Sequence, residues 1–429
     1  MFGWEYPPHI TGGLGTACYA LTKELTSLED VQISFVVPKA HGDEIRGAVK
    51  IIGASNVNLS AKAIRLLKRM RLSVNPHFHP KLTAYTSPNQ YQEFSIHHST
   101  CDKPADKTHK TGKIDLSGGY GDSIFDEIEK YSIVAGEIAS QEPFDIIHAH
   151  DWLTFKAGIA AKKETGKPLV IHVHATEYDR SGDNHNKNVF RVEQSGMKEA
   201  DAIIAVSDLT RNIIIDKYHI PPSKVITIHN AVESVNTGKI DNPWRIGTKD
   251  KIVTFLGRIT HQKGPEFFIE AAGMVLKRME NVRFVMAGMG DLMPRMISLV
   301  AQRGLSCKFH FTGFLRGNDV YRMLCASDLF VMPSVSEPFG IAPLEAIQSS
   351  VPVIISKQSG VSEVLKNAIK VDFWDIHAMA DAIYAVLNYE ALRDTLIKNG
   401  KPEVENMKWA NAAYKIRELY YRLIYSKAG

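Results

Sequence analysis

The stretch LFVMPSVSEPFGIAPLEAI (Leu329 to Ile347) contains three local signals in a row that together indicate a parallel α/β fold. Its first residues form a continuous apolar run, which is typical of a strand buried on both faces of a parallel sheet. A turn rich in Pro and Gly follows, and a helical pattern begins directly after it. The turn carries one carboxylate, Glu337, and the helix carries another, Glu345. The fold alone does not require either acid, so this stretch also predicts a site.

Apolar, β-branched runs of the same kind recur along the whole chain, with helical patterns between them. In the first half the predicted strands are residues 31–38, 144–150, 168–174, 201–207 and 224–230. In the second half they are residues 251–259, 282–288, 307–313, 329–334 and 351–356. Two blocks of strand–helix alternation predict an α/β protein with two Rossmann-like, doubly wound domains.

The chain has 429 residues, which is more than one ordinary core accommodates. A polar stretch without periodicity, Ser234 to Arg245, contains Gly and Pro and marks the predicted boundary. We therefore expect an N-terminal domain over residues 1–240 and a C-terminal domain over residues 241–410. Residues 411–429 form most of a final helix that we expect to pack back on the N-terminal domain.

The composition of the chain favours a globular protein over a nucleic-acid-binding or membrane-spanning one. A hydrophobic content of 44% and a charged content of 23% are ordinary for a soluble globular protein, and a net charge of +4 does not indicate a nucleic-acid partner. No apolar window is long enough to span a membrane, and Glu5, Pro7 and Pro8 interrupt any signal-peptide core. The four cysteines are Cys18, Cys101, Cys307 and Cys325. Their scatter without a CxxC pair predicts a reducing, cytoplasmic location and no thiolate metal site.

Residues 75–122 differ from the rest of the chain because they are rich in His, Thr, Pro and Lys and show little periodicity. A segment of this kind is a functional loop or lid, or is disordered. Its histidines are His77, His79, His97, His98 and His109. Two interpretations of these histidines are a metal site and a solvated loop. The absence of a repeated carboxylate–His spacing favours the loop.

Glycine turns follow predicted strands in both halves. In PPHITGGLGTACYAL (Pro7 to Leu21), Gly12, Gly13 and Gly15 permit a tight turn that exposes backbone amides at a helix N-terminus, which suits an anion. A dinucleotide-binding GxGxxG motif would need glycine at Cys18, so a dinucleotide is disfavoured. A plain strand-to-helix turn is the alternative for this segment alone.

In GRITHQKGPEFFIEAA (Gly257 to Ala272), Arg258 and Lys263 follow the end of a predicted strand. Cations at the carboxyl end of parallel strands face the crevice where ligands bind, and both side chains suit phosphate oxygens. The alternative is a pair of solvated surface cations. For Glu337 and Glu345 the alternative is a structural role near a helix start, where a carboxylate complements the helix dipole.

Taken together, these motifs resemble the retaining glycosyltransferases with the GT-B fold, in the glycogen and starch synthase-like group of glycosyltransferase family 4. The segments that carry the resemblance are PPHITGGLG, IIHAHDWLT, VIHVHATEYDR, GRITHQKG and SEPFGIAPLEA. They occur in this order and span nearly the whole chain, and GRITHQKG with EPFGIAPLE is the most specific combination. HAHDW with GGLG looks most like glycogen synthases. The resemblance implies two Rossmann-like domains with a cleft between them.

The resemblance also implies roles for the residues of the second domain. Glu337 is expected beside the donor sugar and Glu345 at the ribose hydroxyls of the nucleotide. Arg258 and Lys263 are expected to neutralise the departing diphosphate. The remaining nucleotide-binding residues are Gly340, Ile341 and Ala342, whose amides hold the diphosphate, and Phe314 and Leu315 near the base.

In the first domain the resemblance places Gly12 and Gly13 against the same phosphates. His174 matches a histidine beneath the donor sugar, and Asp151 matches an acid on the acceptor side of the cleft. A buried core role is the alternative for His174, and a helix cap is the alternative for Asp151. Since the phosphate-binding turns lie in both domains, we expect the cleft to close about a hinge near residues 234–245 and to stand open when empty.

The expected activity is transfer of glucose, with retention, from ADP- or UDP-glucose to the non-reducing end of an α-1,4-glucan. The resemblance implies no cofactor and no metal, and the sequence contains no Asp-x-Asp pair. A small sugar, a sugar phosphate or a lipid remains open as the acceptor. A nucleotide-sugar epimerase is disfavoured by the paired cations and acids, and a nicotinamide oxidoreductase is disfavoured by Cys18. The sequence leaves the donor base and the oligomeric state open.

Overall fold

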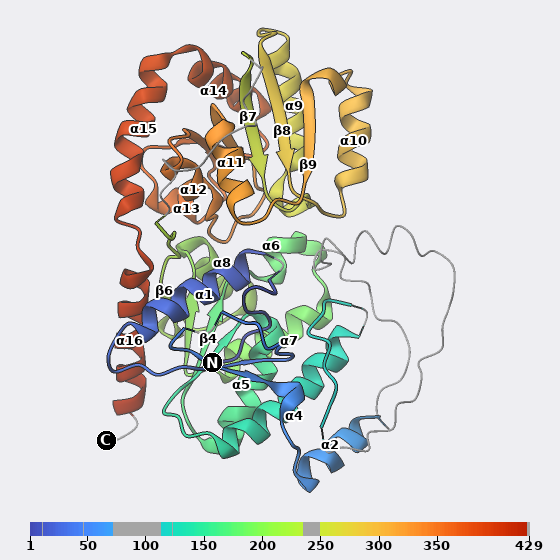
Figure 1. Cartoon of the computed structure of the whole chain (residues 1–429), viewed down its shortest axis with the longest axis vertical. Coiled ribbons are helices and arrows are strands. Elements are labelled where there is room, and N and C mark those ends of the chain that lie inside the picture. Colours follow the sequence, from blue (N-terminus) through green and yellow to red (C-terminus); the bar gives the residue numbers. More distant parts are fainter. Residues whose placement is uncertain (11, 46, 72–112, 122, 235–248, 427–429) are drawn as a thin grey trace.

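Two parallel sheets, one in each half of the chain, carry the fold (Figure 1). The structure is a computed structural model, and it describes all residues except 11, 46, 72–112, 122, 235–248 and 427–429. Every strand pair in both sheets is parallel. The predicted α/β class with two doubly wound sheets is confirmed.

The C-terminal half contains a six-stranded sheet in the order β12-β11-β10-β7-β8-β9. Its strands are β7 (Lys251–Leu256), β8 (Val282–Ala287), β9 (Phe309–Gly313), β10 (Leu329–Met332), β11 (Val353–Ser356) and β12 (Ile369–Val371). Its helices are α9 (Pro265–Leu276), α10 (Met293–Gln302), α11 (Asn318–Ala326), α12 (Ala342–Gln348), α13 (Val361–Val364), α14 (Ile376–Asn388) and α15 (Glu390–Glu405). The strand order reverses between β7 and β10. In such sheets the crevice at this reversal, outside the carboxyl ends of the strands, is where ligands bind.

The N-terminal half has a second sheet with the same kind of reversal. Its strands are β1 (Ser34–Val37), β2 (Lys50–Gly53), β3 (Ile147–His150), β4 (Leu169–Val173), β5 (Ala202–Ala205) and β6 (Val225–Thr227). β1 pairs with β2, and β3 to β6 pair in sequence order. Phe2 joins the two groups, since it bridges Val36 on one side and Ala149 on the other. The opening residues therefore lie in the middle of this sheet, and its reversal falls between them and β3.

Helices cover both sheets. In the N-terminal half they are α1 (Gly13–Thr26), α2 (Ala61–Arg71), α4 (Ile124–Gln141), α5 (Trp152–Thr165), α6 (Glu177–Ser181), α7 (Lys187–Glu199) and α8 (Asp208–Tyr218). Several helices begin where the sequence supplies a cap: the Ser207 hydroxyl accepts a hydrogen bond from the Thr210 amide at α8, and the Asp375 carboxylate accepts one from the Ala378 amide at α14. No described helix is long and apolar enough to span a membrane.

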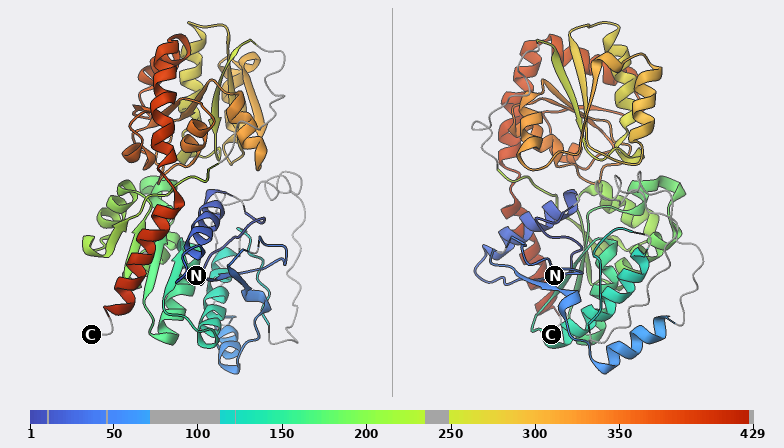
Figure 2. Two further views of the ribbon diagram at one scale, coloured as in Figure 1. Left: turned by 60° about the vertical axis from the view of Figure 1, so that its left-hand side comes forward. Right: turned by 45° about the vertical axis from the view of Figure 1, so that its right-hand side comes forward.

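The last helix, α16 (Trp409–Tyr425), leaves the C-terminal half and lies along the N-terminal half, as both views in Figure 2 show. Ala412, Ala413 and Ile416 are buried in one hydrophobic cluster with Ala17 and Leu21 of α1. Burial of such apolar side chains contributes about 25 cal/mol per Å² removed from water, so this contact ties the end of the chain to the N-terminal half. The predicted boundary between the halves lies in residues outside the described part.

All ten predicted strands contain an observed strand, although the observed strands are shorter. β2 and β12 were not predicted, because runs as short as KIIG and IKV lack the length that separates a strand from a loop. Within the segment 75–122, residues 75–112 and 122, and with them all five of its histidines, lie outside the described residues. Its described end is not a solvated loop, since Ile114 and Leu116 are buried in the N-terminal core.

Candidate active site

One cavity of about 410 Å³ lies between the two halves, and every residue predicted for the site lines it. From the N-terminal half these are Gly12, Gly13, Asp151 and His174. From the C-terminal half they are Arg258, Lys263, Phe314, Leu315, Glu337, Gly340, Ile341, Ala342 and Glu345. The cavity lies at the carboxyl ends of both sheets, where their strand orders reverse.

The cationic and acidic residues of the C-terminal half come from the two strands that flank the reversal. Arg258 follows β7 after Gly257, and Lys263 ends the short 3-10 helix His261–Lys263 that precedes α9. Glu337 lies in the loop after β10. β7 and β10 are hydrogen-bonded neighbours, so residues that are far apart in the sequence face one another across the crevice.

Glu337 is held from several sides. Lys263 Nζ forms an ion pair with Glu337 Oε2, and the Ser334 hydroxyl donates to the same oxygen at 3.2 Å. The Glu337 backbone amide donates to the Gln358 carbonyl at 2.9 Å. Glu337 is only 6% exposed, so the paired lysine offsets the cost of burying its charge. The predicted sugar-side acid and one predicted phosphate-binding cation thus neutralise each other.

Glu345 lies in the first turn of α12 and is partly buried. Burial raises the pKa of the Glu345 carboxyl to about 7, and the hydrogen bond from Tyr321 opposes this shift. The same contact contributes to the raised pKa of Tyr321, of which burial is the main cause. The carboxyl of Glu345 therefore titrates near neutral pH, whereas Glu337 is paired with a cation.

Two glycines allow the backbone to pass closely around the crevice. At Gly264, which has a φ of +65°, an added Cβ would lie 2.1 Å from the Pro333 carbonyl oxygen. At Gly288, which has a φ of +139°, it would lie 1.8 Å from the Gly257 carbonyl oxygen. Only glycine fits these positions, because β7, β8 and β10 converge where the cations leave the sheet.

The glycines at the start of α1 have different surroundings from Gly264 and Gly288. An added Cβ at Gly12 or Gly13 would meet no atom within 4 Å, so both backbones face open space in the cavity. At Gly15 an added Cβ would lie 2.4 Å from Ile10 Cγ2, which makes Gly15 a packing glycine. The start of α1 therefore offers backbone to the cleft at Gly12 and Gly13.

Asp151 does not cap the helix that follows it, so the alternative of a simple helix cap is wrong. It adopts a φ of 58° and a ψ of 167°, and its side chain makes no cap hydrogen bond to α5. Instead Oδ1 accepts hydrogen bonds from the amides of His174, at 2.7 Å, and Ala175, at 3.3 Å. A non-glycine residue in this backbone region costs about 1–3 kcal/mol, which the surrounding contacts must offset. Asp151 thus fixes the turn that leaves β4.

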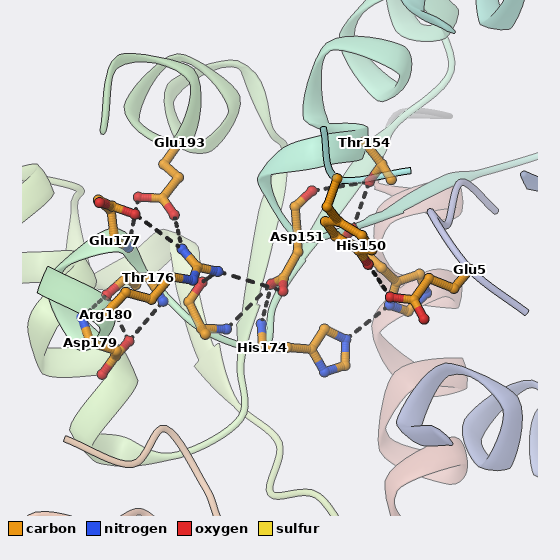
Figure 3. Close-up of polar contacts among 12 residues, drawn as sticks. Glu5, His150, Asp151, Thr154, His174, Thr176, Glu177, Asp179, Arg180 and Glu193 are labelled. Carbon is orange, nitrogen blue, oxygen red and sulfur yellow. Dashed lines mark hydrogen bonds and ion pairs between the residues drawn. The ribbon is translucent and has the colours of Figure 1, made fainter. Parts of the chain in front are cut away.

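Arg180 organises the acids behind this turn (Figure 3). Its guanidinium points between Glu193, at 3.1 Å, and Glu177, at 3.7 Å, on one side and Asp151, at 4.0 Å, on the other. It also donates to the Ala175 carbonyl at 3.2 Å. Burial raises the pKa of Glu193 to about 7, and the Arg180 charge opposes this shift. Arg180 lines the cavity, so this network reaches the cleft surface.

His174 follows β4 and is partly buried. Its Nε2 lies 3.1 Å from His150 Nδ1, and its ring stacks on His172 with a centroid separation of 4.3 Å. Burial lowers the pKa of His174, while the charge of Asp151 opposes this shift. His174 is thus a neutral histidine at the cleft surface. His148, His150 and His172 lie beneath it and are fully buried, as expected of core residues.

Sequence reasoning missed several residues that line the cavity. They are Glu5, Tyr120, Arg180, Asn230, Gly288, Met289 and Gly290. The pattern AGMGD (Ala287 to Asp291) at the end of a predicted strand was a usable signal, since glycines there indicate close backbone approach. Arg180 lies within a quoted motif, but no spacing rule connects it to Asp151. Tyr120 lies in an irregular segment that shows no periodicity.

Two family models match the chain. Residues 130–234 match the model described as Glycosyltransferase Family 4, and residues 236–403 match the model described as Glycosyl transferases group 1. Together they cover more than half of the chain, including β3 to β6 of the N-terminal sheet and all six strands of the C-terminal sheet. The chain belongs to the GT-B glycosyltransferases.

Individual relatives agree with this class. An uncharacterized glycosyltransferase of Methanocaldococcus jannaschii is 28% identical over 98% of this chain and 97% of its own length. A glycogen synthase of Mycobacterium tuberculosis is 23% identical over 98% of this chain and 93% of its own length. Among solved structures, sucrose-phosphate synthase from Thermosynechococcus elongatus is similar in fold, with a TM-score of 0.68 and 18% identity. That match covers 97% of this chain and 94% of the other.

Proposed function

We propose that this glycosyltransferase moves glucose from ADP- or UDP-glucose to the non-reducing end of an α-1,4-glucan, with retention of the anomeric configuration. The observation that carries the proposal is the single cavity in which Arg258, Lys263 and Glu337 of one half face Asp151 and His174 of the other. This arrangement supplies cations for a leaving diphosphate and polar groups for a sugar. The full-length similarity to a glycogen synthase supports the glucan acceptor.

In the proposed mechanism, the diphosphate of the donor binds Arg258 and Lys263, next to the first turn of α12. Amides in the first turn of a helix lack intrahelical partners, so Gly340 to Ala342 can donate to phosphate oxygens. Charge on the leaving oxygen grows in the transition state, and preorganised cations stabilise it more than they stabilise the bound donor. The neutral ring of His174 and the carboxylate of Glu337 bind the sugar. The arriving hydroxyl attacks from the face that the phosphate leaves, and no covalent intermediate with the protein is proposed.

The acceptor enters from the side of Asp151 in this proposal. Arg180 holds the Asp151 carboxylate, and Asp151 holds the backbone of His174, so the acceptor and donor sides are mechanically coupled. The two cations of the C-terminal half take the role that a metal ion has in other glycosyltransferases. Turnover is therefore expected to be unchanged in the presence of EDTA.

The test is donor profiling with the purified full-length chain. Release of nucleoside diphosphate is measured with ADP-glucose, UDP-glucose and other nucleotide sugars, in the presence and absence of glycogen. We expect release from one glucose donor to rise when glycogen is added, and NMR of the product to show an α-linkage. Release that glycogen leaves unchanged, but that a sugar phosphate, a small sugar or a lipid acceptor stimulates, would replace the glucan by that acceptor. Release that needs no acceptor would favour an epimerase or hydrolase instead.

A further inference from the structure

A thiol and two imidazoles meet directly behind the cleft. Cys18 comes from α1, His150 ends β3, and His174 follows β4. One ligand atom from each lies within 4.8 Å of the other two. The separation of 3.1 Å between His150 Nδ1 and His174 Nε2 is close to that of two ligands sharing one tetrahedral ion with metal–nitrogen distances of about 2.0–2.1 Å. The scattered cysteines gave no such signal in the sequence, because the fold alone brings these elements together.

The facing nitrogens of the two imidazoles are close enough to share one ion. His150 Nδ1 and His174 Nε2 form a hydrogen bond with each other, and an ion between them would replace that bond with two metal–nitrogen bonds. Within the described part of the chain, His150 Nε2 and His174 Nδ1 have no hydrogen-bond partner, although both atoms are buried. When the facing nitrogens, His150 Nδ1 and His174 Nε2, bind an ion, these outer nitrogens carry the ring protons.

The charges around the cluster favour a cation. Asp151 Oδ1 accepts a hydrogen bond from the amide of His174, and Glu5 and Asp151 line the cavity together with His174. The negative charge of these carboxylates stabilises a divalent ion bound to a thiolate. A second set of ligand atoms, His148, His150 and His172, lies deeper in the core. It offers three neutral imidazoles, so an ion there would keep its double charge, which is expensive to bury.

We propose that Cys18, His150 and His174 form a binding site for a borderline-soft divalent cation, with Zn²⁺ as the ion that fits its ligands, and that occupancy inhibits the enzyme. Binding forms one Zn–S bond and two Zn–N bonds, and the thiol proton is released to solvent. His174 lines the cavity, so the ion enters through the cleft, and a water molecule from the cleft completes the tetrahedron. Inhibition rests on the proposed function, because the bound ion removes His174 from the donor sugar.

The binding part of the proposal is tested without any activity. Cd²⁺, a softer substitute for Zn²⁺, is titrated into the full chain, and the ultraviolet thiolate-to-cadmium absorption is recorded. We expect a saturating signal at one ion per chain, reversed by excess Zn²⁺. Cys18→Ala should abolish the signal, and the less perturbing Cys18→Ser should weaken ion binding at least about 100-fold. Cys307→Ala, at an exposed cysteine, is the matched control and should leave the signal unchanged. A signal that survives in Cys18→Ala overturns the assignment.

The inhibition part is tested by release of nucleoside diphosphate in the presence of buffered free Zn²⁺. The wild-type chain and Cys307→Ala should lose activity reversibly, with recovery in EDTA. Cys18→Ala should keep its basal activity and need at least about 100-fold more Zn²⁺ for the same inhibition. Equal inhibition of wild type and Cys18→Ala would overturn the regulatory role. Cadmium binding with no release from any nucleotide sugar would contradict the proposed function but leave the metal site standing.

Discussion

At the scale of single residues, the ion pair between Lys263 and Glu337 links the two chemical tasks of the cleft. The lysine is proposed to bind phosphate and the acid to contact the sugar, yet in the structure the two side chains form an ion pair with each other. Donor binding must therefore exchange this ion pair for contacts to the ligand. The pair also keeps a buried carboxylate stable until the donor arrives.

Replacing Lys263 or Arg258 by Ala is expected to lower the turnover number about 100-fold or more. Each side chain stabilises charge that grows on the leaving diphosphate, and groups of this kind supply about 2.7–4 kcal/mol. The measurement is the rate of nucleoside diphosphate release at saturating donor. Lys263→Ala also leaves Glu337 buried and unpaired, so the double variant with Glu337→Gln should recover thermal stability but not turnover. Near-normal turnover in both single variants would contradict the phosphate-binding assignment.

Glu345 predicts a pH dependence of donor binding. Ribose hydroxyls donate to the ionised carboxylate, and burial raises the pKa of Glu345 to about 7. Donor affinity should therefore fall about 10-fold between pH 8 and pH 6. Calorimetry with an intact nucleotide sugar measures it, since such a donor has no phosphate group that titrates in this range. Glu345→Gln should bind more weakly and lose the pH dependence, whereas Glu337→Gln should chiefly lower the turnover number.

The same residue affects stability with the opposite pH preference. A carboxyl whose folded pKa is raised contributes stability fully below its unfolded pKa of 4.5, and the contribution is lost as pH rises through 7. Glu345→Gln should thus raise the melting temperature at pH 8 more than at pH 5. A melting temperature that changes equally at both pH values would show that Glu345 does not titrate in this range.

At the scale of the elements, the crevice depends on the glycine between the 3-10 helix His261–Lys263 and α9. Gly264→Ala must overcome both a left-handed backbone and a Cβ 2.1 Å from the Pro333 carbonyl oxygen. We expect a loss of about 2–4 kcal/mol in unfolding free energy together with loss of activity, because β7 and β10 must separate. Gly304 has a similar φ of +69° but open space around it, so Gly304→Ala should cost only about 1–2 kcal/mol and keep activity. Equal costs in urea unfolding would contradict the close-approach argument.

The elements also show what the sequence can and cannot reveal. Apolar runs such as LFVM and the glycine turns identified the strands and the positions that face the cleft, because periodicity and turn chemistry are local. The contact of the Asp151 side chain with the amides after β4 was not predicted, because it depends on the pairing of β3 with β4. The contacts of Arg180 and the approach of Cys18 to His150 were not predicted for the same reason. Contacts across strands depend on register, which local patterns do not specify.

At the scale of the whole molecule, a few polar contacts join the halves. The Glu363 carboxylate accepts hydrogen bonds from the amides of Asp208 and Leu209 at the start of α8, at 2.8 and 2.7 Å, and lies 2.9 Å from His229 Nε2. The Ser336 hydroxyl donates to Asp179 Oδ1 at 2.7 Å. These contacts bridge the two halves, and opening about residues 234–245, of which 235–245 lie outside the described part, stays a prediction.

Removing Glu363 should favour the open form. Glu363→Ala is expected to enlarge the radius of gyration of the ligand-free enzyme in solution scattering, and saturating nucleotide should return it toward the wild-type value. Glu403→Ala is the matched control, because that carboxylate accepts comparable hydrogen bonds from Lys366 and Asn367 within one half. A radius that neither Glu363→Ala nor nucleotide changes would contradict a hinge.

The path of α16 has a consequence for synthesis on the ribosome. Ala412, Ala413 and Ile416 complete a hydrophobic cluster whose other members include Ala17, Leu21 and Leu25, nearly four hundred residues earlier. The first half of the chain emerges with this surface uncovered, although domains generally fold as they are made. Its core can close only when translation is almost finished. A ribosome-bound nascent chain that ends before Trp409 should therefore expose the α1 surface to chaperones. Docking of the last helix is then the final step in folding of the N-terminal half, which is synthesised first.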